Sequence, residues 1–270
     1  MQWSASVNSA LPIRDKEFMQ SISSAIFIMI GFILIQSGVA SSEQSTHPDW
    51  YVYAKQYIRF DNEFPKLFTR ESVTMEEFKE LNNHRDEAEK NFLNSLPPSK
   101  KEIGTLLSSS NIEDITIGTV SIYLLEKYHL DFIDTLINLL TSSDDKSTQR
   151  FILLSFEKIP PDVLASYESV LLDYISKTDE GWMLFHKSEV LLKLTPEKSA
   201  VILSDWLGRD SRLFKRVAYI YLGNLGTKYQ ENALDNLVKT RNIDKEKFLD
   251  ELYGGRERRP RANSINKNNR

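Results

Sequence analysis

The sequence predicts an all-α fold in which pairs of helices stack one after another, and two observations carry this prediction. A pair of apolar residues followed by a short polar break recurs along the chain, and the second members of these pairs lie 33, 35, 32 and 31 residues apart. A fixed period in this range is typical of stacked supersecondary units. No window alternates apolar and polar residues as a half-buried strand would. The five pairs are Leu106-Leu107, Leu139-Leu140, Tyr174-Ile175, Trp206-Leu207 and Leu237-Val238.

The composition describes a soluble, acidic body. The chain has 270 residues, of which 41% are hydrophobic and 27% charged, so it can bury a substantial core. Residues 41–255 carry 26 basic and 35 acidic side chains, a net charge of −9, whereas residues 256–270 carry six basic side chains against Glu257. Binding a phosphate backbone requires a clustered basic face. We therefore expect no nucleic-acid partner.

The N-terminus contains an apolar run, Ala25–Ile35, followed by the small residues Gly38–Ala40. This pattern is typical of a secretory signal peptide, so we expect residues 1–40 to be removed after the small-residue site. The alternative is an uncleaved membrane anchor formed by residues 22–40, just long enough to cross a bilayer. Met19 is a second candidate start. Both interpretations predict an exported body, periplasmic or anchored, with membrane contact only if the segment is uncleaved.

Known catalytic and metal-binding motifs are missing from the sequence. There is no cysteine, which removes thiol catalysis and every cysteine-based metal site. No histidine has a partner histidine three or four residues away, and His129 at a predicted helix end is expected to cap that helix. No nucleophile elbow, phosphate loop or dinucleotide fingerprint occurs. We expect no catalytic residue, no metal, no cofactor and no enzymatic activity.

Residues 41–98 are predicted to form an N-terminal helical cap. An aromatic-rich helix begins near Trp50 and is interrupted at Pro65, and its aromatic side chains are expected to cover the first repeat. The sequence Thr74–Glu77 has the form of a capping box and predicts a helix over 75–95. A second capping box, Ser99–Glu102, starts the next helix.

Residues 99–253 are predicted to form the repeat domain, and residues 254–270 a disordered basic tail. Each repeat consists of a helix, a turn and a second helix. Acidic residues that precede first helices are expected to act as N-caps; they are Asp145, Asp179 and Asp210. The predicted first helices cover 114–128, 146–158, 180–194 and 211–225, and the second helices 130–141, 162–176, 197–207 and 229–239.

One segment carries a family resemblance. Residues 210–226 resemble the first-helix pattern of HEAT-type repeats, which combines an initial Asp, a following Arg, a small Ala at the interhelix contact and a final Leu-Gly. The matching residues are Asp210, Arg216, Ala218, Leu222 and Gly223. The resemblance covers about residues 99–253, with this unit the best match. It implies a right-handed α-solenoid of HEAT-like helix pairs, whose second helices line a concave face that binds proteins. It implies no chemistry.

A polar residue stands two positions before the second members of the apolar pairs, which predicts a ladder of equivalent positions along the second helices. Thr105 begins this row, and the predicted partner-binding residues are Asn138, Asp173, Asp205 and Asn236. Such a row suits a basic or hydrogen-bonding partner, but an amphipathic helix also has a solvated face without any partner.

The sequence therefore favours an exported, non-enzymatic protein-binding module, in the role of an inhibitor, immunity or scaffold protein of the cell envelope. One alternative is an envelope hydrolase that uses a pair of carboxylates, of which one would lie in an apolar pocket. Another is a membrane-anchored assembly factor. These two alternatives depend on a carboxylate geometry and on an uncleaved N-terminal segment, neither of which a sequence displays.

Overall fold

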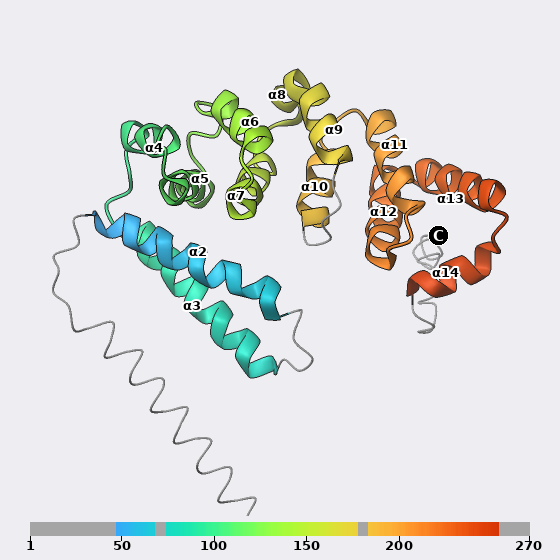
Figure 1. Ribbon diagram of the computed structural model, residues 1–270, viewed down its shortest axis with the longest axis horizontal. Helices are drawn as coiled ribbons and strands as arrows, with labels where there is room; N and C mark the ends of the chain where they lie inside the picture. The colour runs from blue at the N-terminus through green and yellow to red at the C-terminus, as the bar shows by residue number, and fades with distance from the viewer. Residues whose placement is uncertain (1–46, 68–73, 178–182, 254–270) are drawn as a thin grey trace, which may run out of the picture. The chain divides into compact units, whose positions relative to one another are not determined.

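The computed structural model describes residues 47–67, 74–177 and 183–253. Those from Asp49 onward belong to one compact unit, in which every regular element is a helix (Figure 1). The predicted all-α class is thereby confirmed for the described residues. The predicted signal peptide or anchor and the basic tail lie outside them. The helices are α2 (Asp49–Leu67), α3 (Met75–Asn94), α4 (Lys100–Leu107), α5 (Ile112–Leu125), α6 (Ile133–Ser142), α7 (Lys146–Phe156), α8 (Pro161–Leu164), the 3-10 helix η1 (Ala165–Tyr167), α9 (Glu168–Ser176), α10 (Leu184–Leu191), α11 (Pro196–Leu207), α12 (Arg212–Leu225), α13 (Thr227–Arg241) and α14 (Lys245–Tyr253).

Helices α2 and α3 form a hairpin that packs on α5 (Figure 1). Aromatic residues of α2, including Trp50 and Tyr57, share a buried cluster with Phe92 of α3 and Phe151 of α7. The Tyr51 hydroxyl donates a hydrogen bond to Asp114 of α5 over 2.7 Å. The expectation that the aromatic residues of the first helix cover the next helices is therefore confirmed.

Both predicted capping boxes are present. The side chain of Thr74 accepts from the Glu77 amide and Glu77 accepts from the Thr74 amide, and Ser99 and Glu102 make the same pair of bonds. These reciprocal bonds satisfy amides that have no partner inside the helix. The starts of α3 and α4 consequently fall where the sequence predicts them.

Two predicted helices differ from the observed ones. Helix α2 continues past Pro65 to Leu67; a proline at this position removes one i→i−4 hydrogen bond, and the helix extends only two residues beyond it. The second helix predicted over 162–176 is divided into α8, η1 and α9. Here the 3-10 turn carries Tyr167, whose hydroxyl donates to Asp134 over 2.6 Å. Helix α14, which the sequence analysis did not predict, begins after Asp244, whose side chain accepts from the Lys247 amide.

The predicted capping residues have mixed outcomes. Asp145 is the N-cap of α7 and accepts from the Thr148 amide, as expected, whereas Asp179 lies outside the described residues. Asp210 does not cap α12, because the N-cap is Ser211, and no side chain bonds to the free amides there. His129 does not cap α5 either: it lies three residues beyond the C-cap, Glu126, and is buried.

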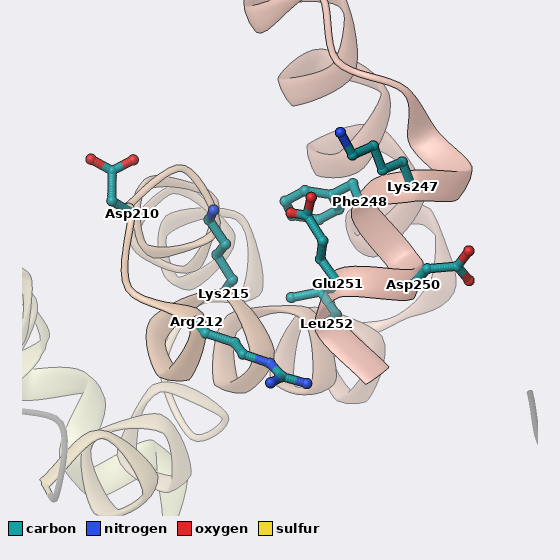
Figure 2. Close-up of a pocket in the computed structure, with 8 residues that line it drawn as sticks. All are labelled: Asp210, Arg212, Lys215, Lys247, Phe248, Asp250, Glu251 and Leu252. Atoms are coloured by element: carbon teal, nitrogen blue, oxygen red, sulfur yellow. The ribbon is translucent and has the colours of Figure 1, made fainter. Parts of the chain in front are cut away.

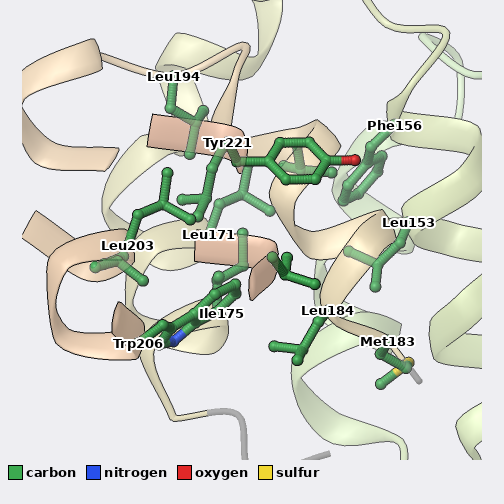
Figure 3. Close-up of a cluster of buried hydrophobic side chains, with 14 of the residues drawn as sticks. Leu153, Phe156, Leu171, Ile175, Met183, Leu184, Leu194, Leu203, Trp206 and Tyr221 are labelled. Carbon is green, nitrogen blue, oxygen red and sulfur yellow. The ribbon is translucent and has the colours of Figure 1, made fainter. Parts of the chain in front are cut away.

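The recurring apolar pairs mark the buried side of the helices. A continuous core extends from Ile103 to Leu252, and Figure 3 shows Ile175 and Trp206 together within it. Leu107, Leu140 and Leu207 are also buried. Val238 is partly buried against the same core. The pairs therefore supply the apolar burial that holds neighbouring helices together.

The sequence period also reappears in the side-chain hydrogen bonds. Lys158 and Glu126 are bonded over 2.6 Å, and Tyr221 and Glu189 over 2.5 Å, and each pair is 32 residues apart in sequence. The buried hydroxyls of Thr116 and Thr148, also 32 residues apart, are 2.7 Å from each other. Each bond joins a helix or its end to a segment about one period later in the chain.

Candidate functional site

The four residues predicted to bind a partner lie on four different helices, which are separated along the chain by α7, α10 and α12. Asn138 is on α6, Asp173 on α9, Asp205 on α11 and Asn236 on α13, and all four side chains are exposed. Thr105 of α4 is exposed as well. We call the four predicted residues the polar ladder. The ladder is open to solvent, as a contact surface requires.

The acidic members of the polar ladder are neutralised by cations just beyond the C-terminal ends of their helices. Asp173 pairs with Lys177 over 2.7 Å, and Asp205 pairs with Arg209 over 3.1 Å, both at i,i+4 spacing. Exposed pairs of this kind contribute only a few tenths of a kcal/mol. The mildly acidic strip expected from the sequence is thus a strip of balanced charge that still offers polar groups.

The helices that carry the polar ladder are connected to one another at their starts. Tyr229 donates to Glu197 over 2.7 Å, and Glu168 accepts from both the Thr195 amide, over 2.8 Å, and the Lys198 ammonium. The hydrogen bonds from Lys198 and Thr195 favour the ionised carboxylate of Glu168 and lower its pKa to about 2. The bonds join the N-terminal ends of α9, α11 and α13, three of the helices that carry the ladder.

A buried ionic network connects the hairpin to α7 and α10. Asp61 of α2 is almost completely buried and pairs with Arg150 of α7 through both guanidinium nitrogens. The Arg150 Nε–H also donates to Nε2 of His186 over 3.4 Å, and the other ring nitrogen of His186 lies 3.0 Å from Glu157. Burial raises the pKa of Asp61, and the adjacent Arg150 opposes that rise.

The sequence alone does not predict this network. The signal that could have found it is an acidic residue, Asp61, that follows Phe60 directly and precedes Phe64 on the otherwise aromatic face of the first helix. A carboxylate on a buried face needs a cationic partner. The chain supplies that partner 89 residues later, at Arg150.

A hollow of about 590 Å³ opens between α12 and α14 (Figure 2). Phe248 and Leu252, both buried, form its apolar floor. The Lys215 ammonium lies 5.7 Å from the centre of the Phe248 ring. Figure 2 shows Lys215 on the α12 side of the hollow and Lys247 and Glu251 on the α14 side. The remaining lining residues are Asp210, Arg212 and Asp250, so both signs of charge are present.

Helix α12 has an unusual charge distribution. It contains Arg212, Lys215 and Arg216 and no acidic residue, although the body around it is acidic. All three cations lie in the N-terminal half of the helix, where the helix dipole disfavours positive charge. Among the described residues, none of the three forms an ion pair with a carboxylate. This part of α12 is therefore a basic segment without direct ion pairs, although Asp210, Asp250 and Glu251 line the same hollow as Arg212 and Lys215.

Neither a metal site nor a membrane-spanning helix occurs in the part of the chain that the structure describes. No three histidine, aspartate or glutamate side chains there are grouped as a metal site would require. None of the helices in that part is both long enough and apolar enough to cross a bilayer.

Comparisons with protein families, with curated proteins and with solved structures found no match to this chain.

Proposed function

We propose that this chain is a non-enzymatic, protein-binding helical-repeat module built from HEAT-like helix pairs in a right-handed α-solenoid. The observation that carries the proposal is the polar ladder, which presents one exposed polar residue on each of α6, α9, α11 and α13. Side-chain bonds about one period apart support the repeat arrangement. Repeats of this kind serve as extended contact surfaces for partner proteins.

The expected site of action is the cell envelope. The apolar run Ala25–Ile35 and the small residues after it support export, with cleavage after Ala40. N-terminal sequencing of the protein recovered from envelope fractions tests this: a chain that begins at residue 41 supports a periplasmic body. A chain that retains residues 22–40 would instead favour a membrane-anchored assembly factor. Recovery from the cytosol with an intact N-terminus would contradict export.

A structural role fits the buried carboxylate Asp61 better than a hydrolytic one. A hydrolase needs an acid in an apolar pocket that is available to substrate. Asp61 is buried and its pKa is raised, but both of its oxygens accept from Arg150. We therefore propose an inhibitor, immunity or scaffold role, with a protein as the ligand.

Photo-crosslinking tests the proposal directly. A photoreactive amino acid is placed at Asn138, Asp205 or Asn236 in the full chain, and cross-linked products are identified from the native envelope. We expect the same partner protein from all three positions. The matched control is Glu87, an exposed helical residue of α3 away from the ladder, which should give no such product. Absence of a product from every ladder position would contradict the proposal.

A further inference from the structure

Cations of α12 share an exposed face with apolar side chains. Leu213, Arg216 and Ile220 follow one another at spacings of three and four residues, so they form one stripe along two turns of the helix. Leu213 and Ile220 are each 41% exposed, and they flank Arg216 on the same side of the helix. Arg212, one turn before Arg216, begins the stripe. We call these four residues the α12 surface.

The α12 surface is open to solvent, whereas α5 and α7 contact the α2–α3 hairpin. The α2–α3 hairpin packs on α5, and its residues reach α7 through Asp61. On the adjacent α10, Phe185 is 47% exposed. An apolar residue on each of two neighbouring helices is therefore left open to solvent, next to positive charge.

The cost of this arrangement argues that it has a use. Three cations in the first half of a helix oppose the helix dipole, and Ser211 makes no side-chain cap to offset them. Leu213 and Ile220 each leave 41% of their surface exposed, and that part gains nothing from burial. Residues that lower the stability of their own helix without an evident structural gain are expected at functional surfaces.

We infer that the α12 surface binds an acidic, amphipathic segment of a partner protein. Apolar side chains of that segment would contact Leu213 and Ile220, and its carboxylates would pair with Arg212 and Arg216. Arg216 is the central position, since bidentate pairing with a carboxylate suits the guanidinium group. The inference rests on the proposed binding function and adds the chemistry of the partner.

Charge complementarity favours a protein segment over other anionic partners. A lipid surface is recognised by clusters of about four to eight Lys or Arg residues, and nucleic acid by a longer basic face. The α12 surface has two cations, and Lys215 beside it a third. The adjoining hollow adds Asp210, Asp250 and Glu251, which would repel a continuous array of phosphates. A short segment that combines carboxylates with apolar groups avoids that repulsion.

A random peptide library displayed on phage provides the probe. The full chain is used as bait, and enriched peptides are synthesised and measured by fluorescence anisotropy. We expect peptides with acidic and apolar residues at helical spacing. Arg216→Glu should weaken their binding at least tenfold, and so should the double change of Leu213 and Ile220 to Ser. The matched controls, Lys101→Glu and Val201→Ser, alter an exposed cation and an exposed aliphatic elsewhere and should leave affinity unchanged.

The following outcomes of these experiments would overturn the inference. Enriched peptides that are basic, or that bind Arg216→Glu as well as the wild type, would remove the α12 surface as the site. Failure to enrich any peptide would do the same. Arg216-dependent binding of vesicles that contain phosphatidylserine, or Arg216-dependent self-association in ultracentrifugation, would replace the partner by a membrane or a second copy. Because the polar ladder is tested separately by cross-linking, none of these results decides the proposed function.

Discussion

At the scale of single residues, the most consequential feature is the ion pair of Asp61 and Arg150. The carboxylate is 1% exposed and lies among aromatic rings. Desolvation makes a buried charge unfavourable unless a partner and further hydrogen bonds compensate it. Arg150 supplies two bonds to Asp61 and one to His186. The pair therefore connects the hairpin to α7 only while both members are present.

Removing Arg150 should be far more damaging than removing an exposed cation. We expect Arg150→Ala to lower the free energy of unfolding by about 3 kcal/mol or more, because it leaves the Asp61 carboxylate buried without its counterion. Urea denaturation of the folded chain measures this. The control Lys177→Ala breaks the exposed pair with Asp173 and should cost less than about 0.5 kcal/mol. Equal effects of the two changes would contradict the buried character of the Asp61 pair.

His129 should make stability depend on pH. Burial lowers the pKa of His129 below its ordinary value of 6.5, and no hydrogen-bond partner is found for its buried Nε2 within the described residues. Below pH 6.5 the unfolded chain binds a proton that the folded chain does not, so stability falls as the pH falls. We expect a contribution of up to about 1.4 kcal/mol per pH unit at this site. His129→Gln should flatten the dependence between pH 7 and pH 5 in denaturation experiments, and an unchanged slope would contradict the assignment.

At the scale of elements, α12 and α13 show opposite relations between charge and dipole. Cations occupy the first half of α12, whereas Lys239 and Arg241 lie in the last turn of α13, where the dipole favours them. The two helices are joined by Gly226, whose φ of 144° is a conformation that side-chain-bearing residues rarely adopt. Because the chain turns at Gly226, α12 ends at Leu225 and α13 begins at Thr227.

Charge reversal at matched positions should therefore act in opposite directions. Arg212→Glu places a carboxylate in the first turn of α12 and should raise the free energy of unfolding by about 0.5 kcal/mol. Lys239→Glu places one in the last turn of α13 and should lower it by a similar amount. Thermal and urea unfolding at low salt measure both, and 1 M salt should reduce both effects. A destabilised Arg212→Glu variant would show that Arg212 supports the fold.

The elements that the sequence predicts well are those with a local physical signal. The capping boxes at Thr74 and Ser99 and the N-cap at Asp145 act within four residues, so their sequence alone defines them. Helix α14 is held by contacts of Phe248 and Leu252 with the core, which a short, highly charged segment does not reveal. Asp210 precedes α12 by two residues, and only the structure distinguishes it from the N-cap.

The candidate site likewise has features that the sequence predicts and features that it does not. The exposure of the polar ladder follows from amphipathic spacing and was predicted. Its charge balance, through Lys177 and Arg209, requires knowledge of which i+4 neighbours are helical. The Asp61–Arg150 pair joins residues 89 apart, and no local pattern specifies such a pairing.

At the scale of the whole molecule, burial is unevenly distributed along the chain. Helices α7 and α11 bury several large side chains, among them Phe151, Phe156 and Trp206. Helix α13 has Leu234 as its one fully buried residue, and α14 buries Phe248 and Leu252. In stacked helical units, stability is approximately a sum of local terms and contacts with neighbours. The C-terminal helices should accordingly be the least stable.

Hydrogen exchange followed by mass spectrometry checks this gradient. We expect amides of α13 and α14 to exchange well before those of α7 and α11, because local opening there exposes less apolar surface. Mild urea should widen the difference before global unfolding. Uniform exchange across the four helices would mean that the described unit unfolds as one cooperative block.

The bonds between residues 32 apart also determine how the chain tolerates changes of length. One residue inserted within a helix rotates everything after it by about 100°, which moves Tyr221 away from Glu189 or Thr148 away from Thr116. Removal or duplication of a complete period restores the same partners on the same faces. We expect insertions of single residues to be tolerated only in the turns, and changes of one complete period to be tolerated better than changes of one residue.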